Sequence, residues 1–457
     1  MRGPGEILLV STYELGHQPS GITFPKAFLE RQGFRPAALD LAAEPLDLAR
    51  LEKARLIALS VPMHTALRLA LSAVPAIRRA NGQAKLAFHG LYALLEAPLL
   101  RSRGACATLG AECEEELVAL ALALERGEDT TPFLRVGRAG ATLARLAFPV
   151  PSREGLPALT SYARLLGPDG GAHLAGYSEA SRGCKHLCRH CPIAPLYRGR
   201  FFAIPVEVVE EDVARQVARG ARHITFGDPD FLNGPRHALR VATALHRRFP
   251  GVTFDFTAKI EHLRKEARLL PELRERGALF VVSAVESLSD LVLEKLDKGH
   301  RRADVFEAFE ACRRAGLALR PSLVPFTPWA TLDDYLDLLD TFHREGWLDA
   351  LDPVQLSVRL LVPPGSLLLD DPSFVAEGFD EAALSFCWRH PDPRVDRLQE
   401  KVAARVEAGK VSAEPPAATV AAVRALAEAA AGRPHVHVSR PAALVSPGPR
   451  LSESWFC

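Results

Sequence analysis

The chain has 457 residues, of which 48% are hydrophobic and 24% charged, and its 56 Lys and Arg residues nearly balance 55 Asp and Glu residues. This length predicts two or three domains of an ordinary globular protein. The balanced charge, without a basic block, argues against a nucleic-acid partner, and no apolar run reaches the roughly 18 residues of a membrane-spanning helix. Because no signal-peptide pattern is seen and the 8 cysteines form no disulfide framework, we expect a cytoplasmic protein.

Residues 1–128 alternate apolar runs with helical patterns. Strands are expected at 7–11, 56–60 and 85–89, and helices at 23–32, 67–81 and 114–125. This alternation predicts a Rossmann-like parallel sheet covered by helices, with a ligand at the carboxyl ends of the strands. Residues 129–173, rich in Gly, Pro and Arg, are expected to form a linker.

The alternation resumes in a second predicted domain, residues 174–364. Six strands are expected, with helical patterns between them, at 174–178, 223–226, 253–256, 279–283, 318–322 and 354–359. Six successive βα units predict a partial (β/α)6 barrel of the TIM type, with its site at the carboxyl ends of the strands. The remaining segment, 365–457, is expected to be mainly helical and to end in a Pro-rich tail.

The strongest chemical signal is a loop with three cysteines, Cys184, Cys188 and Cys191, directly after the first expected barrel strand. Thiolates are soft ligands for zinc, copper(I) or iron–sulfur clusters. Structural zinc sites and electron-carrying four-iron clusters normally use four protein ligands, whereas three thiolates leave one iron of a [4Fe-4S] cluster open. A zinc site completed by His186 or His190, or an iron–sulfur electron-transfer protein, is the alternative.

The spacing Cys-x3-Cys-x2-Cys after the first strand of such a domain resembles the radical S-adenosylmethionine (SAM) superfamily. The resemblance implies that Cys184, Cys188 and Cys191 hold a [4Fe-4S] cluster whose open iron binds SAM. An electron from a low-potential donor such as ferredoxin or flavodoxin would then cleave SAM reductively to a 5′-deoxyadenosyl radical. The reaction implied is a methyl transfer or another radical modification of an unknown substrate.

Two further stretches resemble SAM-binding positions of that superfamily. Gly227 and Asp228 follow the second expected barrel strand and resemble the stretch that holds the SAM amino group, while Glu286 and Ser287 resemble the ribose-contacting pair. From the residues alone, the first stretch is equally a turn, and Ser287 is equally a helix N-cap.

The N-terminal domain resembles the cobalamin-binding domain of one branch of the superfamily. That pattern is Asp-x-His-x-x-Gly, then Ser-x-Leu, then Gly-Gly. Aligning Ser60 with the pattern's serine places His89 and Gly90 at the diglycine and residues 14–16 over Asp-x-His, so the ligand histidine is absent from register and His17 lies one position away. Cobalamin bound without this ligand and a domain that has lost the cofactor are both open.

The chain ends in Trp455, Phe456 and Cys457. This end resembles a bacterial group of radical SAM proteins whose C-termini read Trp-Phe-Cys, then Cys or selenocysteine, then Ala-Glu-Pro. The resemblance implies that a selenocysteine codon after Cys457 was read as a stop and that Cys457 belongs to a catalytic Cys–selenocysteine pair, since selenols ionise readily and ionised groups are nucleophilic. The alternative is that Cys457 is an inert true end.

Overall fold

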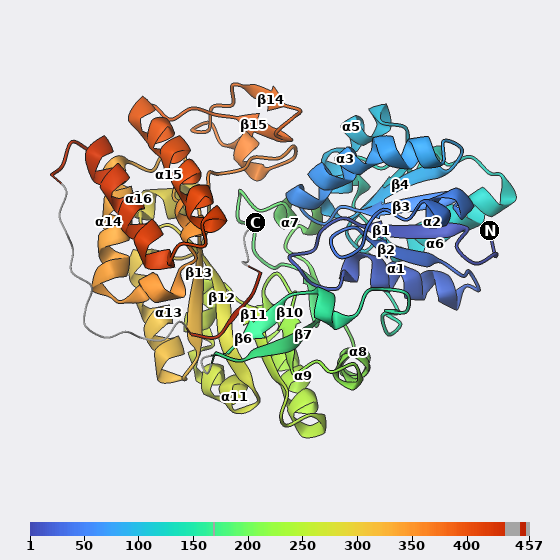
Figure 1. Cartoon of the computed structure of the whole chain (residues 1–457), viewed down its shortest axis with the longest axis horizontal. Coiled ribbons are helices and arrows are strands. Elements are labelled where there is room, and N and C mark those ends of the chain that lie inside the picture. Colours follow the sequence, from blue (N-terminus) through green and yellow to red (C-terminus); the bar gives the residue numbers. More distant parts are fainter. Residues whose placement is uncertain (168–169, 435–447, 454–457) are drawn as a thin grey trace.

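A five-stranded parallel sheet forms the N-terminal lobe, at the right of Figure 1. The computed structural model describes residues 1–167, 170–434 and 448–453. The strand order is β2-β1-β3-β4-β5, with these bounds: β1 (Ile7–Ser11), β2 (Ala37–Asp40), β3 (Leu56–Ser60), β4 (Lys85–His89) and β5 (Ala105–Leu109). The three predicted strands are confirmed as β1, β3 and β4, and the α/β class is confirmed with them.

Helices cover both faces of this sheet. Leu9 packs in one core with Phe28, whereas Leu8 packs in a second core with Leu67, so neighbouring residues of β1 are buried on opposite faces. Burial on both faces explains why the strand sequences are continuously apolar. The helices are α1 (Ser20–Arg31), α2 (Leu48–Lys53), α3 (His64–Ala80), α4 (Leu91–Leu95), α5 (Ala97–Ser102) and α6 (Glu114–Arg126).

The strand order creates a switch point between β1 and β3. β2 lies on one side of β1, and β3, the next strand in the chain, lies on the other side, so the order of the strands reverses here. In such sheets ligands bind outside the carboxyl ends of the strands at this point. There Ser11 pairs with Ser60, and Ser60 pairs with His89 on the other side.

A second, seven-stranded sheet follows in the order β13-β12-β11-β10-β7-β6-β16. Five strands are parallel, and β6 and β16 extend the sheet by antiparallel pairing. The bounds are β6 (Arg164–Leu166), β7 (Ala172–Ser178), β10 (His223–Phe226), β11 (Thr253–Thr257), β12 (Ala278–Glu286), β13 (Ala318–Leu323) and β16 (Arg450–Leu451). Figure 1 shows this sheet as a curved partial barrel below the centre of the molecule.

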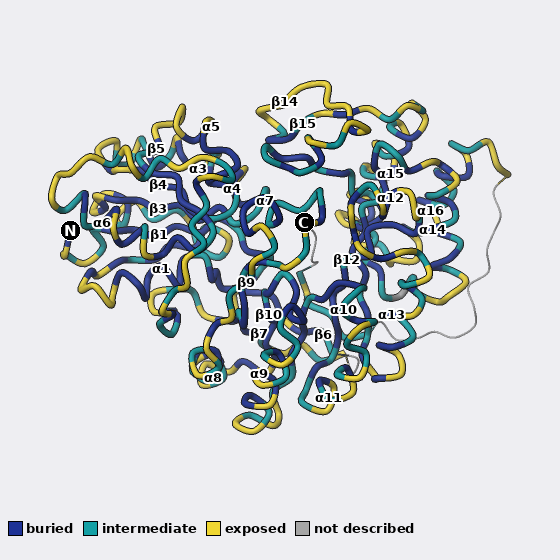
Figure 2. The backbone as a smooth tube through the Cα atoms, turned by 180° about the vertical axis from the view of Figure 1, so that it is seen from behind, coloured by how far each residue is buried: buried dark blue, intermediate teal, exposed yellow. Residues whose placement is uncertain are grey.

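Helices on the outside of the partial barrel connect its parallel strands, and α14 follows the last of these strands. They are α8 (Val206–Ala218), α9 (Pro235–Arg248), α10 (Ile260–Lys265), α11 (Leu270–Glu275), α12 (Asp290–Lys295), α13 (Arg302–Arg314) and α14 (Leu332–Arg344). Figure 2 shows the backbone of the strands as mainly buried and these helices as banded with exposed residues, as expected for amphipathic helices on a sheet.

The expected sixth barrel strand, 354–359, is not formed, which corrects the sequence prediction. The segment begins as a 3₁₀ turn, Pro353–Leu356, in which the Asp352 side chain accepts a hydrogen bond from the Val354 amide. The side chain of Gln355, rather than a strand backbone, accepts the hydrogen bond of the Leu323 amide at 2.8 Å. The 3₁₀ turn takes up the first half of the expected strand, and an isolated parallel bridge joins Phe326 to Arg359.

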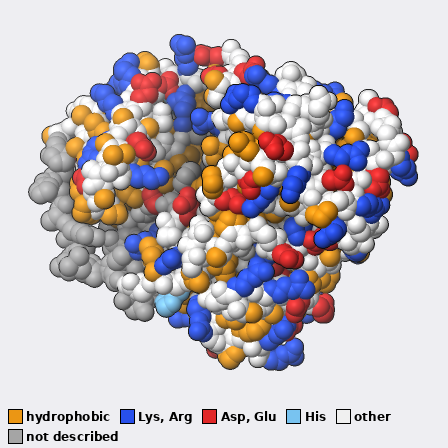
Figure 3. All heavy atoms as spheres, turned by 45° about the vertical axis from the view of Figure 1, so that its right-hand side comes forward, with side chains coloured by type: hydrophobic (Ala, Val, Ile, Leu, Met, Phe, Trp, Pro, Cys, Tyr) orange, Lys and Arg blue, Asp and Glu red, His pale blue; other side chains and the backbone are white. Residues whose placement is uncertain are grey.

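The C-terminal part is mainly helical, as predicted, and lies at the left of Figure 1. It contains α15 (Pro393–Val411), α16 (Pro416–Ala430) and a small hairpin of β14 (Gly378–Asp380) and β15 (Ser385–Cys387). In the described chain no helix combines the length and hydropathy needed to cross a bilayer. On the face shown in Figure 3, basic and acidic side chains are interspersed, in keeping with the formal net charge of +1.

Candidate functional site

The three-cysteine loop joins two short antiparallel strands, β8 (Ser181–Gly183) and β9 (Phe201–Ala203), after the first parallel barrel strand. Gly183 precedes the first cysteine with a φ of +75°, and a Cβ there would lie 2.3 Å from the Tyr197 ring. Only glycine has both this backbone freedom and this small volume. Gly183 therefore fixes the point at which the chain leaves β8 and turns into the loop.

The three thiols are free and lie on one loop, residues 184–191. Cys188 is buried, Cys184 and Cys191 are partly buried, and the Cys191 amide donates to the Cys188 carbonyl oxygen at 3.2 Å. Burial raises the pKa of Cys184 to about 12 and that of Cys191 to about 11. Such thiols keep their protons at neutral pH unless a metal displaces them. The donor set of three soft sulfur ligands fits a [4Fe-4S] cluster with one iron left open.

Distant residues hold this loop in place. The Asn233 side chain accepts a hydrogen bond from the Lys185 amide at 3.1 Å and donates one to the Gly183 carbonyl oxygen at 3.4 Å. On the other side the Arg189 amide donates to the Leu296 carbonyl oxygen at 2.9 Å. Sequence reasoning missed Asn233, although its position in the stretch after the second barrel strand was a usable signal.

Glu286 lies at the end of β12 and faces the cysteine loop. Its Oε1 atom is 3.2 Å from Nε2 of His190 and 3.0 Å from Nζ of Lys298. Burial by itself raises the pKa of Glu286, but the attraction of Lys298 and His190 outweighs it and holds this pKa well below its usual range. The site therefore contains a buried, ionised carboxylate. Sequence reasoning missed Lys298 as its partner.

Ser287, the predicted neighbour of Glu286 in the site, is buried and turned to the backbone. Its Oγ atom accepts a hydrogen bond from the Ser289 amide at 3.1 Å, just before α12 begins. This contact is a local turn, and Ser289, not Ser287, is the N-cap residue of α12.

Gly227 and Asp228 lie directly after β10 and contact the start of the cysteine loop. Asp228 is 2% exposed, and its carboxylate accepts hydrogen bonds from the Ala180 amide at 2.8 Å and from Ser181 Oγ at 2.6 Å. Burial raises the pKa of Asp228 to about 7. A Cβ on Gly227 would lie 1.7 Å from Oη of Tyr177. The structure thus brings both residues to the predicted region, where they pack the first barrel strand against the loop.

The two histidines of the loop face carboxylates. The Nε2 atom of His190 faces Glu286, while His186 has Nε2 3.8 Å from Asp230 and Nδ1 3.5 Å from Glu261. Both ring nitrogens of His186 are thus directed at acidic side chains, which disfavours His186 as a fourth ligand beside the thiols.

At the switch point of the N-terminal sheet the buried atoms Oγ of Ser60 and Nε2 of His89 have no hydrogen-bond partner. The first turn of α1 packs over this edge, because a Cβ on Gly21 would lie 2.2 Å from Ser60 Oγ and 2.5 Å from Glu14 Oε1. His17 is buried and stacks on Tyr177 of the barrel, with ring centroids 4.8 Å apart. Because His17 is buried against Tyr177, the residues present do not fit a cobalamin ligated by His17. Cys457 lies outside the described residues.

Comparisons with known proteins place this geometry in a family. The model of the radical SAM superfamily matches residues 178–348. Among curated proteins, tRNA-2-methylthio-N(6)-dimethylallyladenosine synthase of Fusobacterium nucleatum is 24% identical over 186 residues, which are 35% of this chain and 39% of that protein. Ribosomal protein uS12 methylthiotransferase RimO of Petrotoga mobilis is 21% identical over 182 residues, 37% of this chain and 42% of that protein. The matches thus span about two fifths of these relatives.

Solved structures share the fold of both lobes. The cobalamin-dependent SAM radical enzyme OxsB, with aqua-cobalamin and SAM bound, has a TM-score of 0.67 at 16% identity over 88% of this chain and 66% of that chain. The radical SAM methyltransferase TsrM from Kitasatospora setae, with tryptophan and a SAM analogue bound, has a TM-score of 0.59 at 20% identity over 74% of this chain and 70% of that chain.

Fold and site define a class of protein, in which a parallel α/β domain precedes a partial barrel whose first parallel strand leads to a loop of three free thiols. The matched segment contains that loop and the parallel strands β10, β11, β12 and β13, and it begins at Ser178, the last residue of β7. The matched segment, residues 178–348, is a radical SAM domain.

Proposed function

We propose that this chain is an enzyme that cleaves SAM reductively, with Cys184, Cys188 and Cys191 holding a [4Fe-4S] cluster. The observation that carries the proposal is the set of three free thiols on one loop at the mouth of the partial barrel, inside the segment matched by the radical SAM model. When bound, the cluster supplies the electron that converts SAM to methionine and a 5′-deoxyadenosyl radical.

The residues around the loop have separate roles in this proposal. Glu286, kept ionised by Lys298 and His190, is an acceptor for the ribose hydroxyls of SAM. Ser287 shapes the turn beside it. Gly227 and Asp228 border the amino group of SAM, and the contacts of Asp228 with Ala180 and Ser181 hold the loop against the end of β10.

Anaerobic reconstitution tests the proposal. The chain is loaded with iron and sulfide, reduced with dithionite and mixed with SAM, and 5′-deoxyadenosine is measured. We expect about four irons and four sulfides per chain and release of 5′-deoxyadenosine. Tightly bound zinc in place of iron would favour the alternative of a zinc protein, and a stable cluster without SAM cleavage would favour an electron-transfer protein.

The reaction class is a methyl transfer or another radical modification of an unknown substrate. Fold similarity to TsrM and OxsB supports a lobe arrangement in which the N-terminal domain faces the radical site. SAM labelled in its methyl group, and separately in its adenosyl group, distinguishes the two outcomes. Methyl label in the product made from the substrate indicates methyl transfer. Adenosyl label in that product, or a hydrogen from the substrate in 5′-deoxyadenosine, indicates another radical modification.

For cobalamin we propose that His17 is not a cobalt ligand, since its ring stacks on Tyr177 and Glu14 stands at the pattern's first position. Titration with hydroxocobalamin, followed by visible absorbance, measures binding. We expect His17→Ala to leave any bound spectrum unchanged. A spectral change typical of lost imidazole ligation in His17→Ala would contradict this.

For the electron donor we propose a low-potential cytoplasmic ferredoxin or flavodoxin that docks on the cysteine loop. Lys185 is exposed and Leu187 is 49% exposed, so a basic and an apolar side chain project beside the thiols. Lys185→Glu should slow turnover driven by flavodoxin but not turnover driven by dithionite. If Lys185→Glu and the parent turned over at the same rate with flavodoxin, docking on this loop would be contradicted.

A catalytic role of Cys457 also stays a proposal, together with a selenocysteine after it. The genomic codons after position 457 test it, because a downstream Ala-Glu-Pro in frame after TGA is the expected result. Cys457→Ser in the full-length product should then abolish product formation without affecting iron content.

A further inference from the structure

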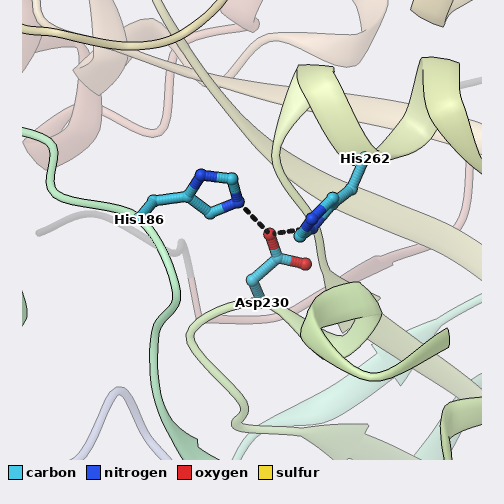
Figure 4. A group of neighbouring side chains, drawn as sticks. All are labelled: His186, Asp230 and His262. Carbon is cyan, nitrogen blue, oxygen red and sulfur yellow. Dashed lines mark hydrogen bonds and ion pairs between the residues drawn. The ribbon is translucent and has the colours of Figure 1, made fainter. Parts of the chain in front are cut away.

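Two histidines and an aspartate converge beside the cysteine loop (Figure 4). His186 comes from the loop itself, Asp230 from the turn after β10, and His262 from α10. The Oδ2 atom of Asp230 is 2.7 Å from Nδ1 of His262 and 3.8 Å from Nε2 of His186. Two imidazole nitrogens from different elements therefore approach one carboxylate oxygen.

The group has the burial and orientation of a built site. The Asp230 side chain is 0% exposed, and its other oxygen, Oδ1, accepts the Leu232 amide at 3.0 Å, which fixes the direction of Oδ2. The Nε2 atom of His186 is buried without a hydrogen-bond partner, and its Nδ1 atom is 3.5 Å from Oε2 of Glu261. Metal-binding histidines commonly have a carboxylate next to the ring nitrogen that does not bind the metal, and Glu261 holds this position next to Nδ1 of His186.

We propose that His186, Asp230 and His262 bind a divalent transition-metal ion of the zinc type through Nε2, Oδ2 and Nδ1. Two nitrogens and one carboxylate oxygen suit zinc or ferrous iron and leave open positions for water or a ligand. Ligand atoms at about 2.1 Å from a tetrahedral zinc are roughly 3.4 Å apart, and the observed separations of 2.7 Å and 3.8 Å lie on either side of this value. Small side-chain rotations would bring all three atoms to the ion.

The site uses none of the three thiols, so the ion and the proposed cluster would have separate ligands. His186 lies between Cys184 and Cys188 in the sequence, and the ion would join this part of the loop to α10. Lys259, 3.8 Å from Glu261, offsets part of the local negative charge, so the net attraction for a cation comes mainly from Asp230. The ion would stiffen the loop that presents the thiols.

Cobalt(II) binding to a chain that carries Cys184→Ala, Cys188→Ala and Cys191→Ala tests the proposal without competition from thiols. We expect one Co²⁺ per chain, with visible ligand-field absorbance but without the near-ultraviolet charge-transfer band of a cobalt–thiolate bond. Adding His262→Ala should weaken binding by more than about tenfold. The matched control is His173→Ala, which removes an exposed histidine of β7 and should leave binding unchanged.

A second measurement covers the case in which the cysteine-free chain does not fold. The intact chain with its reconstituted cluster is incubated with zinc, passed over a desalting column and analysed for both metals. One zinc per chain, lost in Asp230→Asn and in His262→Gln while iron content is unchanged, supports the proposal. No retained zinc in the intact chain, or zinc content equal in the variants and the parent, overturns it.

Discussion

The Nζ atom of Lys298 lies 3.0 Å from Oε1 of Glu286, with side-chain exposures of 3% and 7%. The two residues flank α12, and the loop histidine His190 meets the same carboxylate oxygen. Because the Arg189 amide also bonds to the Leu296 carbonyl oxygen, this segment both supplies the charge partner of Glu286 and holds the cysteine loop. The pair thus connects the end of β12 to the region that would hold the cluster.

Lys298→Met should destabilise the chain by about 3–5 kcal/mol, because it leaves Glu286 as a buried charge without its main partner. The exposed pair of Arg313 and Glu310, with side-chain exposures of 74% and 44%, provides the control, and Arg313→Met should leave stability nearly unchanged. Urea unfolding measures both. A Lys298→Met variant as stable as the parent would show that Glu286 finds another partner.

The same pair has a defined pH dependence. The pKa of Glu286 is lowered in the folded state, so its contribution to stability is complete above the unfolded-state pKa of about 4.3 and is lost as pH falls below it. The pKa of Lys298 is raised by the attraction of Glu286 despite burial, so its contribution persists until pH exceeds about 10.4. When the free energy of unfolding is measured from pH 3 to pH 7, the difference between the parent and Lys298→Met should become smaller at the lower pH values.

Cys188→Ala should abolish retention of iron and with it formation of 5′-deoxyadenosine. The proposed cluster depends on all three thiolates, and Cys188 is the most deeply buried of them. Cys387→Ala is the control, since this free cysteine is exposed on β15, away from the cysteine loop in the sequence. Iron and acid-labile sulfide are measured after reconstitution. Full iron content in Cys188→Ala would contradict the assigned ligands.

Gly227→Ala should destabilise the chain by roughly 1–3 kcal/mol, the usual cost of an overpacked core. The added Cβ would lie 1.7 Å from Oη of Tyr177, so the ring must move. Gly251→Ala is the control, because a Cβ there meets no atom within 4 Å. Thermal unfolding compares the two variants, and an unchanged midpoint in Gly227→Ala would mean that Tyr177 relocates freely.

Glu14→Gln should stabilise the chain increasingly as pH rises. Burial raises the pKa of Glu14 to about 8, so the folded state keeps the proton that the unfolded state loses near pH 4.3. The stability of the parent therefore falls between these values, by at most about 1.4 kcal/mol per pH unit, and the glutamine variant lacks this loss.

Unfolding at pH 5 and pH 8 measures this effect. The exposed Glu115 of α6 gives the matched control, Glu115→Gln, whose difference from the parent should not grow over this range. An equal effect of Glu14→Gln at both pH values would show that Glu14 is already ionised in the fold.

Local patterns in the sequence predicted much of the fold. The apolar runs at β1, β3 and β4 were recognisable because strands covered on both faces are continuously apolar. The five parallel strands of the barrel contain polar residues and were recognisable as short β-rich runs between helical patterns. The sixth expected strand failed, because Pro353 and the Asp352 cap favour a 3₁₀ turn over a ladder. The short strands β6 and β16 carry no such signal, since their pairing joins residues nearly three hundred positions apart.

The sequence by itself determined the chemistry of the loop, because the spacing of Cys184, Cys188 and Cys191 and the glycine before them are local properties of the chain. Tertiary structure alone decided which charges meet. Lys298 partners Glu286 across α12. Asp230 lies between His186 and His262 because separate βα units bring their strand ends to one mouth. Buried charges need partners at hydrogen-bond distance, and only the folded barrel shows where those partners lie.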